Sequence, residues 1–320
     1  MIAEGKRVLA LCGGVGGAKL ALGLQHILAP DQLTVVVNTG DDFDHLGLRI
    51  CPDLDTVMYT LAGLNDTERG WGLAGETWSG LGALERLGAE TWFQLGDQDL
   101  ATHLVRSQQL ANGASLTEVT ASLCDRLGVS VNVLPMSDDR VSTQVATDSG
   151  ELGFQHYFVR EQCKPAVTGF RFEGIEQASP QPDLLQLLRG NTLAAIVICP
   201  SNPFVSIDPI LSVPGVRQAL NQSAAPVIAV SPIIAGRAIK GPTAKMMAEM
   251  SMPASAEAVA AYYGSLLDGF ILDEHDSDQS DGIAARGIEV STAPTFMKSV
   301  QDRIDLAEHV LMFSRTFIQR

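Results

Sequence analysis

The sequence predicts an α/β fold, namely a Rossmann-like, doubly wound and mostly parallel sheet with an inserted smaller α+β subdomain. Short, continuous apolar runs of the kind buried in parallel sheets recur along the chain, at residues 8–12, 33–37, 193–198 and 227–230. The first two runs flank a helical pattern, and this βαβ order favours parallel strands joined by a right-handed crossover. Each run ends in a polar segment that contains glycine or proline. Because ligands bind beyond the carboxyl ends of parallel strands, we expect these segments to converge on one site.

The first third of the chain is typical of one βαβ unit followed by helices. A strand at residues 8–12 leads through the glycine-rich segment 13–17 into a helix at 18–28 and a second strand at 33–37. A long polar loop is expected over residues 38–53. Apolar periodicity predicts further helices, at residues 54–64, 79–88, 99–112 and 115–127. Ser115 and Glu118 have the spacing of a capping box, which marks the start of the last of these helices.

The middle of the chain changes character and predicts antiparallel strands. We expect strands at residues 130–134, 141–147, 152–159 and 168–172. Asp148, Ser149 and Gly150 form a turn signal between two of them, which favours a hairpin. The whole chain, residues 1–320, is therefore interpreted as a single nucleotide-binding domain with a subdomain inserted at about residues 115–180.

The α/β pattern returns in the last third. Strands are expected at residues 193–198, 227–230 and 269–272, and the first two end in proline-containing polar loops. The acidic, serine-rich stretch 273–282 predicts a mobile loop. A helix over residues 295–313 is expected to close the fold.

Composition limits the classes of partner. The 320 residues include 22 basic and 37 acidic side chains, a net charge of −15. This balance argues against broad binding of nucleic acid and against docking on anionic membranes, both of which need a basic surface. The five cysteines are dispersed without a C-x-x-C pair. No signal peptide and no membrane-spanning run is recognised, so we expect a cytoplasmic protein with reduced cysteines.

The segment RVLALCGGVGGAKL at residues 7–20 is the strongest functional signal. Glycines between a strand and a helix let backbone N–H groups approach an anion, and the helix N-terminus adds its positive dipole. Neither the Walker A pattern nor the dinucleotide fingerprint is matched. We therefore predict a phosphate-binding turn of a third kind, with the alternative that the glycines only allow close packing. The residues concerned are Gly13, Gly14, Val15, Gly16, Gly17 and Lys19.

Polar residues after other strands are the remaining candidates. Asp42 and Asp55 are predicted to bind Mg²⁺, which prefers carboxylate oxygens, or to orient a hydroxyl; the alternative for the Asp53–Asp55 pair is helix capping. Asn38 and the segment Ser201, Asn202 and Pro203 are predicted to contact a nucleotide, with an ordinary turn as the alternative for the latter. The six histidines show no metal-binding spacing.

Several segments together resemble one family over nearly the whole chain. They include, besides residues 8–20, the stretches VVVNT, PDLDTV, LGDQD, LPMSDD, PSNP, VSPII and KGPT, in that order. On these motifs the chain resembles the 2-phospho-L-lactate transferase family of coenzyme F420 biosynthesis. Within that resemblance PMSDD, PSNP and SPII are specific, whereas the glycine turn alone is not.

The resemblance implies a transferase. It implies that a phospho-three-carbon-acid group, 2-phospholactate or phosphoenolpyruvate, passes from a guanosine diphosphate donor to the deazaflavin Fo, releasing GMP. It also implies a requirement for magnesium, a homodimer, and contacts of Asp55 with Fo. Gln94 is the second residue that the resemblance predicts to contact Fo; some relatives have lysine at this position, and glutamine keeps a hydrogen-bond donor without the charge.

Two rival functions were weighed against the transferase. The first is a non-enzymatic, nucleotide-sugar-binding regulatory protein of a related glycine-loop family, from which the PMSDD and SPII motifs are not expected. The second is an NAD-dependent dehydrogenase, which the broken fingerprint and Asn38 disfavour because Asn38 occupies the place of an acidic ribose ligand.

Overall fold

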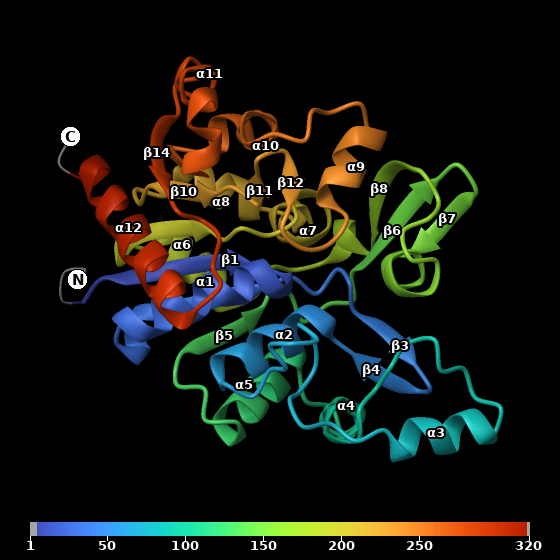
Figure 1. Cartoon of the computed structure of the whole chain (residues 1–320). Coiled ribbons are helices and arrows are strands. Elements are labelled where there is room, and N and C mark those ends of the chain that lie inside the picture. The colour runs from blue at the N-terminus through green and yellow to red at the C-terminus, as the bar shows by residue number, and fades with distance from the viewer. Residues whose placement is uncertain (1–4, 319–320) are drawn as a thin grey trace.

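A computed structural model describes residues 5–318 and has a seven-stranded, entirely parallel sheet at its centre. The strand order is β14-β13-β10-β9-β1-β2-β5, and Figure 1 shows the layers around it. The predicted α/β class with a doubly wound parallel sheet is confirmed. The strands are β1 (Arg7–Cys12), β2 (Leu33–Val37), β5 (Asn132–Pro135), β9 (Leu193–Ile198), β10 (Val227–Val230), β13 (Gly269–Asp273) and β14 (Glu289–Ala293).

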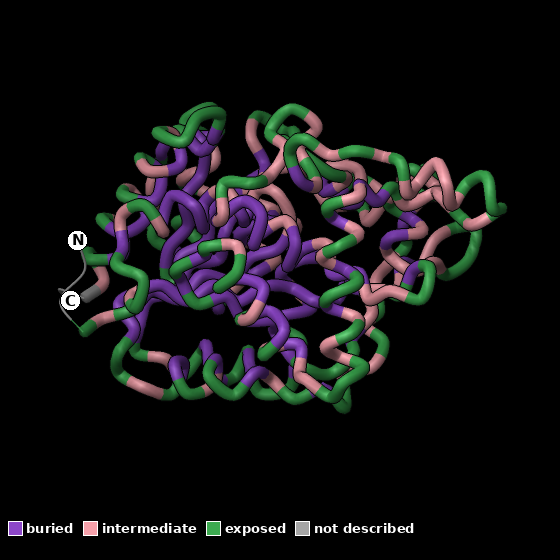
Figure 2. Tube along the Cα trace, turned by 90° about the horizontal axis from the view of Figure 1, so that it is seen from below, coloured by how far each residue is buried: buried purple, intermediate pink, exposed green. Residues whose placement is uncertain are grey.

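Helices cover both faces of this sheet because alternate residues of each strand point to opposite sides. On one face Val8 and Ala10 of β1 contribute to a core with α1, α2, α5 and α12; on the other, Leu9 and Leu11 contribute to a core with α6, α7, α8 and α10. Figure 2 shows the buried strands running through the middle of the molecule. The helices are α1 (Gly14–Ile27), α2 (Pro52–Leu61), α5 (Leu116–Arg126), α12 (Val300–Ile318), α6 (Pro182–Arg189), α7 (Asp208–Ser212), α8 (Val216–Gln222) and α10 (Ala256–Tyr263).

The remaining elements surround the carboxyl ends of the strands. A hairpin of β3 (Phe43–His45) and β4 (Leu48–Ile50) follows β2. Further elements are α3 (Ser79–Arg86), α4 (Asp97–Ala111), α9 (Thr243–Glu249), α11 (Ser280–Ala284), β11 (Ile233–Ile234) and β12 (Arg237–Ala238). The capping box predicted at Ser115 and Glu118 is confirmed, because each side chain accepts a hydrogen bond from the other residue's backbone N–H.

An antiparallel sheet lies between β5 and α6 in the chain. It has the order β7-β6-β8, formed by β6 (Ser142–Thr147), β7 (Gly150–Gly153) and β8 (Val167–Glu173). The strand expected at 130–134 was wrongly assigned to this unit, since β5 pairs in parallel with β2. Its buried run Val133, Leu134 and Pro135 is typical of the parallel sheet. The chain also leaves β7 at Gly153 and forms a π-helical turn, His156–Arg160, where a longer strand was expected.

Three other expectations were wrong in detail. The loop predicted over 38–53 contains the β3–β4 hairpin, whose turn uses positive φ at Leu46 and Gly47. The stretch 273–282 is helical rather than a mobile loop, because Asp273 caps its first turn and Asp276 accepts the backbone N–H of Ala235. The strand β14, which follows this stretch, was not predicted, because it is a short edge strand of mixed polarity.

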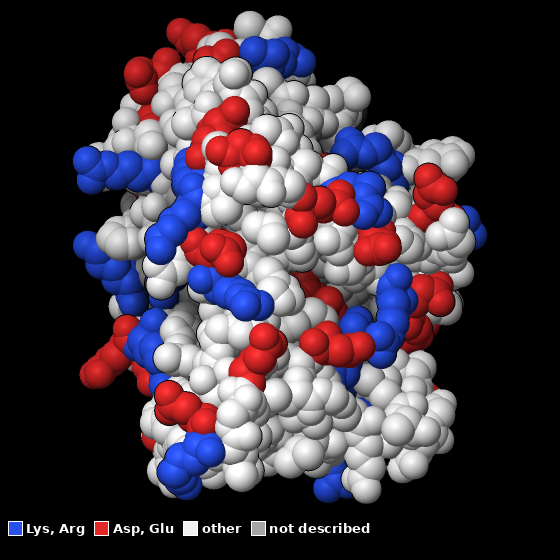
Figure 3. All heavy atoms as spheres, turned by 90° about the vertical axis from the view of Figure 1, so that its right-hand side faces the viewer, with Lys and Arg blue, Asp and Glu red and all other residues white. Residues whose placement is uncertain are grey.

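The last helix begins at Val300 and not at residue 295, since Ser299 and Asp302 exchange hydrogen bonds at its start. The preceding residues form part of the wall of a cavity. No helix among residues 5–318 combines the length and apolarity that crossing a membrane requires. On the face that carries the antiparallel sheet, Figure 3 shows acidic and basic side chains interspersed.

Candidate active site

A cavity with a volume of about 680 Å³ lies at the carboxyl ends of the central strands. The four segments expected to converge do so. The glycine turn contributes Gly13, Gly14, Val15, Gly16 and Lys19, and the loops after β2, β9 and β10 contribute Asp41, Pro200, Ser201, Asn202, Ser231 and Pro232. The strand order reverses next to β1, so the cavity lies at the switch point of the doubly wound sheet.

The glycine segment is the first turn of α1 and not a separate loop. The helix begins at Gly14, whose φ of +64° favours glycine. A Cβ at Gly16 would lie 2.2 Å from the carbonyl oxygen of Pro200, and one at Gly17 would lie 2.5 Å from Ser201 Oγ. Close packing therefore requires these two glycines. This agrees with the alternative interpretation of the segment, in which the glycines allow strand and helix to pack closely.

That turn also presents unpaired donors to the cavity. Gly13 N–H donates to Ser201 Oγ (3.2 Å), and Gly14 N–H donates to Asp53 Oδ1 (2.6 Å). The next two N–H groups, of Val15 and Gly16, precede the first intrahelical bond and have no partner within residues 5–318. These are the groups that bind anions at helix N-termini.

A pair of buried carboxylates, Asp41 and Asp53, faces the same cavity. Their residues are 4% and 7% exposed. Asn38 joins them by donating from Nδ2 to Asp53 Oδ2 (2.9 Å) and Asp41 Oδ1 (3.4 Å), and Gln155 donates to Asp41 Oδ2 (3.2 Å). No basic side chain of the described residues forms an ion pair with either carboxylate.

Burial without a counter-charge raises the pKa of both carboxyl groups. Burial raises the pKa of Asp53 to about 7, although Asn38 and the Gly14 amide donate hydrogen bonds to it. Burial, with the nearby charges of Asp53 and Asp42, raises the pKa of Asp41 well above its usual range. A divalent cation between them would supply the missing positive charge, so this pair fits a magnesium site.

The two carboxylates predicted to bind metal instead face arginines. Asp42 pairs with Arg49 (3.3 Å), and burial raises the pKa of Asp42 to about 6 despite that neighbour. Arg106 is buried, and its Nη1 and Nη2 both donate hydrogen bonds to the Asp55 carboxylate. Neither aspartate lines the main cavity. A nearby arginine disfavours a cation at these two positions.

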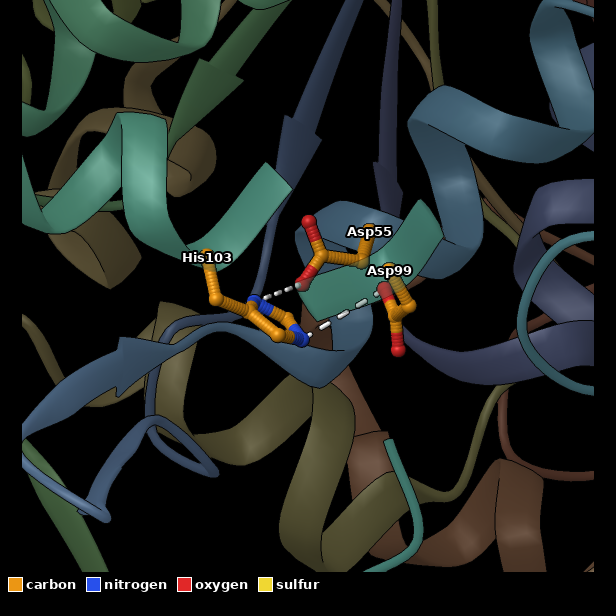
Figure 4. Close-up of side chains that lie close together, drawn as sticks. All are labelled: Asp55, Asp99 and His103. Carbon is orange, nitrogen blue, oxygen red and sulfur yellow. Dashed lines mark ion pairs between the residues drawn. The ribbon is translucent and has the colours of Figure 1, made fainter. Parts of the chain in front are cut away.

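Asp55 lines a smaller pocket of about 80 Å³, which shares Pro52 and Thr56 with the main cavity. Figure 4 shows His103 between Asp55 and Asp99, with Nδ1 3.7 Å from Asp55 Oδ2 and Nε2 3.4 Å from Asp99 Oδ1. Their ligand atoms lie within 4.8 Å of one another, close enough for a metal. Arg106 lies 3.1 Å from His103 Nδ1, however, and supplies the positive charge there.

Of the other predicted residues, some line the cavity and others do not, and several have structural contacts. Lys19 Nζ donates to the carbonyl oxygen of Met297 (2.9 Å), and burial followed by the nearby Arg303 and Lys240 lowers the pKa of Lys19. Asn202 Oδ1 accepts the backbone N–H of Phe204 and so caps the π-helical turn Pro203–Ile207, where the alternative interpretation was an ordinary turn. Gln94 lines the cavity. Gly17, Asn38 and Pro203 are not among its lining residues.

Aromatic side chains that the sequence analysis missed form another part of the cavity wall. They are Trp71, Trp92, Phe93, Phe154, Phe158 and Phe296. The rings of Phe154 and Phe158 are stacked, with centroids 5.5 Å apart, and the ring centroids of Trp92 and His156 are 4.6 Å apart. The adjacent pair Trp92 and Phe93, directly before Gln94, was the available signal, since only 6% of the chain is aromatic.

Comparison with known proteins supports one family. The sequence model of the family described as "2-phospho-L-lactate transferase CofD" matches residues 8–298. A protein from Kitasatospora aureofaciens named phosphoenolpyruvate transferase is 43% identical over 312 residues, covering 95% of this chain and 97% of that protein. A protein of the same name from Nocardia farcinica is 39% identical over 320 residues, covering 95% of this chain and 96% of that protein.

The fold has a more distant solved counterpart. A crystal structure of a UPF0052 family member from Bacillus halodurans matches with a TM-score of 0.63 at 15% identity, covering 97% of this chain and all of that one. At this identity the likeness concerns the fold alone.

Proposed function

The chain belongs to the 2-phospho-L-lactate transferase CofD family, and we propose that it transfers a phospho-three-carbon-acid group from a guanosine diphosphate donor to the deazaflavin Fo, releasing GMP. Membership makes the chain a transferase of phosphate groups in coenzyme F420 biosynthesis. Of the two acids left open by the sequence, we favour phosphoenolpyruvate because similar proteins bear that name.

One observation carries the proposal: unpaired helix N-terminal amides and two uncompensated buried carboxylates face a single cavity. In the proposed complex, the Val15 and Gly16 amides with Lys19 bind the donor diphosphate, as helix N-termini bind phosphates. Ser201 and Asn202 contact the nucleotide from the neighbouring loop.

Asp41 and Asp53 are the residues that we propose to hold Mg²⁺, in place of Asp42 and Asp55. They lie beside the glycine turn, and Gly14 N–H donates to Asp53. Magnesium neutralises charge on the donor's diphosphate and so favours departure of GMP. The two carboxylates also limit where the diphosphate can lie, because they repel it wherever no cation intervenes.

The acceptor is proposed to enter along the aromatic wall. A flat heteroaromatic ring packs well against Trp92 and Phe158, and Gln94 offers a hydrogen-bond donor beside them. Asp55, held by Arg106 at the adjoining small pocket, remains a predicted contact of Fo. Transfer forms a bond between phosphorus and the terminal hydroxyl oxygen, breaks the bond to GMP, and releases the hydroxyl proton to a nearby carboxylate or water.

The direct test is a transfer assay. The purified chain is incubated with Fo, Mg²⁺ and either guanylated phosphoenolpyruvate or guanylated 2-phospholactate, and the products are identified by mass spectrometry. We expect GMP and the phosphoenolpyruvyl ester of Fo, with slower turnover of the phospholactate donor. Preference for phospholactate would correct the assigned acid, and no transfer from either donor would refute the proposal.

A further inference from the structure

Lys240 is a cation of the cavity wall that the mechanism above does not use. It lies in the loop between β12 and α9, within the segment KGPT, and Ile239 to Thr243 all line the cavity. Its Nζ donates to the carbonyl oxygen of Gly70 (3.4 Å) in the loop between α2 and α3. The two loops are separated by 170 positions in the chain, so Lys240 connects two distant parts of the cavity wall.

Gly70 accommodates this ammonium group closely. A Cβ at Gly70 would lie 1.7 Å from Lys240 Nζ, and the φ of Gly70 is +81°. Any side chain at this position would therefore displace the lysine as well as strain the backbone.

The charge of Lys240 has no acidic partner. Across the described part of the chain no carboxylate lies within ion-pair distance of Lys240 or of Lys19, and the hydrogen bond of each ammonium group goes to a neutral carbonyl. The two lysines are near enough for Lys240 to contribute to the lowered pKa of Lys19. In a protein of net charge −15, two unpaired cations beside one cavity are suited to an anion.

We propose that Lys240 is a specificity-determining residue. When the donor binds, its ammonium group gives up the hydrogen bond to the Gly70 carbonyl oxygen and donates instead to the carboxylate of the donor's three-carbon acid. This inference rests on the proposed function. In the proposed complex the glycine-turn amides and Lys19 bind the diphosphate. The carboxylate of the three-carbon acid is the remaining anionic group of the donor. A charged hydrogen bond to that carboxylate is stronger than the present bond to a neutral oxygen, so the exchange favours donors that carry it.

The test compares ligands with and without the acid. Binding of GDP and of guanylated phosphoenolpyruvate is measured by calorimetry for the unaltered chain, for Lys240→Gln and for Lys240→Arg. We expect Lys240→Gln to bind the complete donor roughly tenfold to a hundredfold more weakly, with GDP affinity unchanged. Lys240→Arg keeps the charge, and we expect its affinity for the complete donor to be within a few-fold of that of the unaltered chain.

Two further readouts separate this role from a structural one. In the transfer assay Lys240→Gln should raise the KM for the donor and leave the KM for Fo unchanged. Lys164→Gln removes an exposed lysine outside the cavity and is the matched control. It should change neither the KM for the donor nor the KM for Fo.

The possible failures are distinguishable. Equal weakening of GDP and donor would show that Lys240 binds the diphosphate, and an unaffected donor affinity would show that it binds neither; either result overturns the inference alone. If the unaltered chain binds no guanylated donor, the proposed function fails and the role of Lys240 fails with it.

Discussion

At the scale of single residues, the site is defined by which carboxylates have a cationic partner. Asp42 and Asp55 each face an arginine, whereas Asp41 and Asp53 face the cavity without one. Four aspartates within fifteen positions thus divide into two pairs with different chemistry. The sequence shows the four residues but not this division, because Arg106 approaches Asp55 from 51 positions away.

The raised pKa values predict how stability depends on pH and magnesium. An aspartate in an unfolded chain has a pKa of about 3.9, whereas Asp53 has a pKa of about 7 in the folded protein. Between these values the folded state binds more protons, so this group makes the free energy of unfolding fall as pH rises from about 4 to about 7. We expect Mg²⁺ to raise the melting temperature at pH 8 and to have little effect at pH 5.

Thermal unfolding with Mg²⁺ or with a chelator, at both pH values, measures this effect. Asp53→Asn is the informative variant, because it keeps the shape but removes the charge. It should lose most of the magnesium response, because one of the two carboxylate oxygens is replaced by an NH2 group, which cannot bind a cation. A magnesium response that is unchanged in Asp53→Asn would exclude Asp53 as a ligand.

At the scale of elements, the start of α1 serves packing and binding together. Gly16 lies against the Pro200 carbonyl and also lines the cavity. A helix can offer its amides to a ligand at this place only because its first turn packs directly on the neighbouring loop. The two interpretations of the glycine segment are therefore compatible.

Substitution of Gly16 by alanine should accordingly damage both roles. The new Cβ would lie 2.2 Å from a backbone oxygen that cannot rotate away. We expect a loss of about 1–3 kcal/mol in the free energy of unfolding and weaker GDP binding, measured by denaturant unfolding and calorimetry. Gly169→Ala is the control, because nothing lies within 4 Å of its added Cβ. Unchanged stability of Gly16→Ala would contradict this packing.

At the scale of the whole molecule, the cavity is assembled from both halves of the chain. Trp92 comes from the segment between α3 and α4, Phe158 from the π-helical turn between β7 and β8 of the antiparallel sheet, and Phe296 from the segment before α12. The antiparallel unit thus supplies part of the cavity wall, and Gln155 connects it to Asp41 by a hydrogen bond (3.2 Å).

This arrangement predicts an optical signal of acceptor binding. Trp71 and Trp92 line the cavity, whereas Trp78 does not. We expect Fo to quench the tryptophan fluorescence and Trp92→Phe to reduce that quenching substantially, in titrations corrected for absorption by Fo. Trp78→Phe should lower the starting intensity and raise the fraction that Fo quenches, because it removes emission from a tryptophan outside the cavity. Equal fractional quenching in Trp92→Phe and the unaltered chain would place the acceptor elsewhere.

The sequence by itself determined five of the seven strands of the parallel sheet, all but β5 and β14, and the region of the site. Continuous apolar strands are a local property, so the limits of β9 and β10 were predicted correctly, and the rule that loops meet at the carboxyl ends located the cavity. Only the tertiary structure decided which side chains face that cavity. The pairing of Asp55 with Arg106, the isolation of Asp41 and Asp53, and the aromatic wall all depend on contacts between distant segments, and such contacts leave no local pattern in a single sequence.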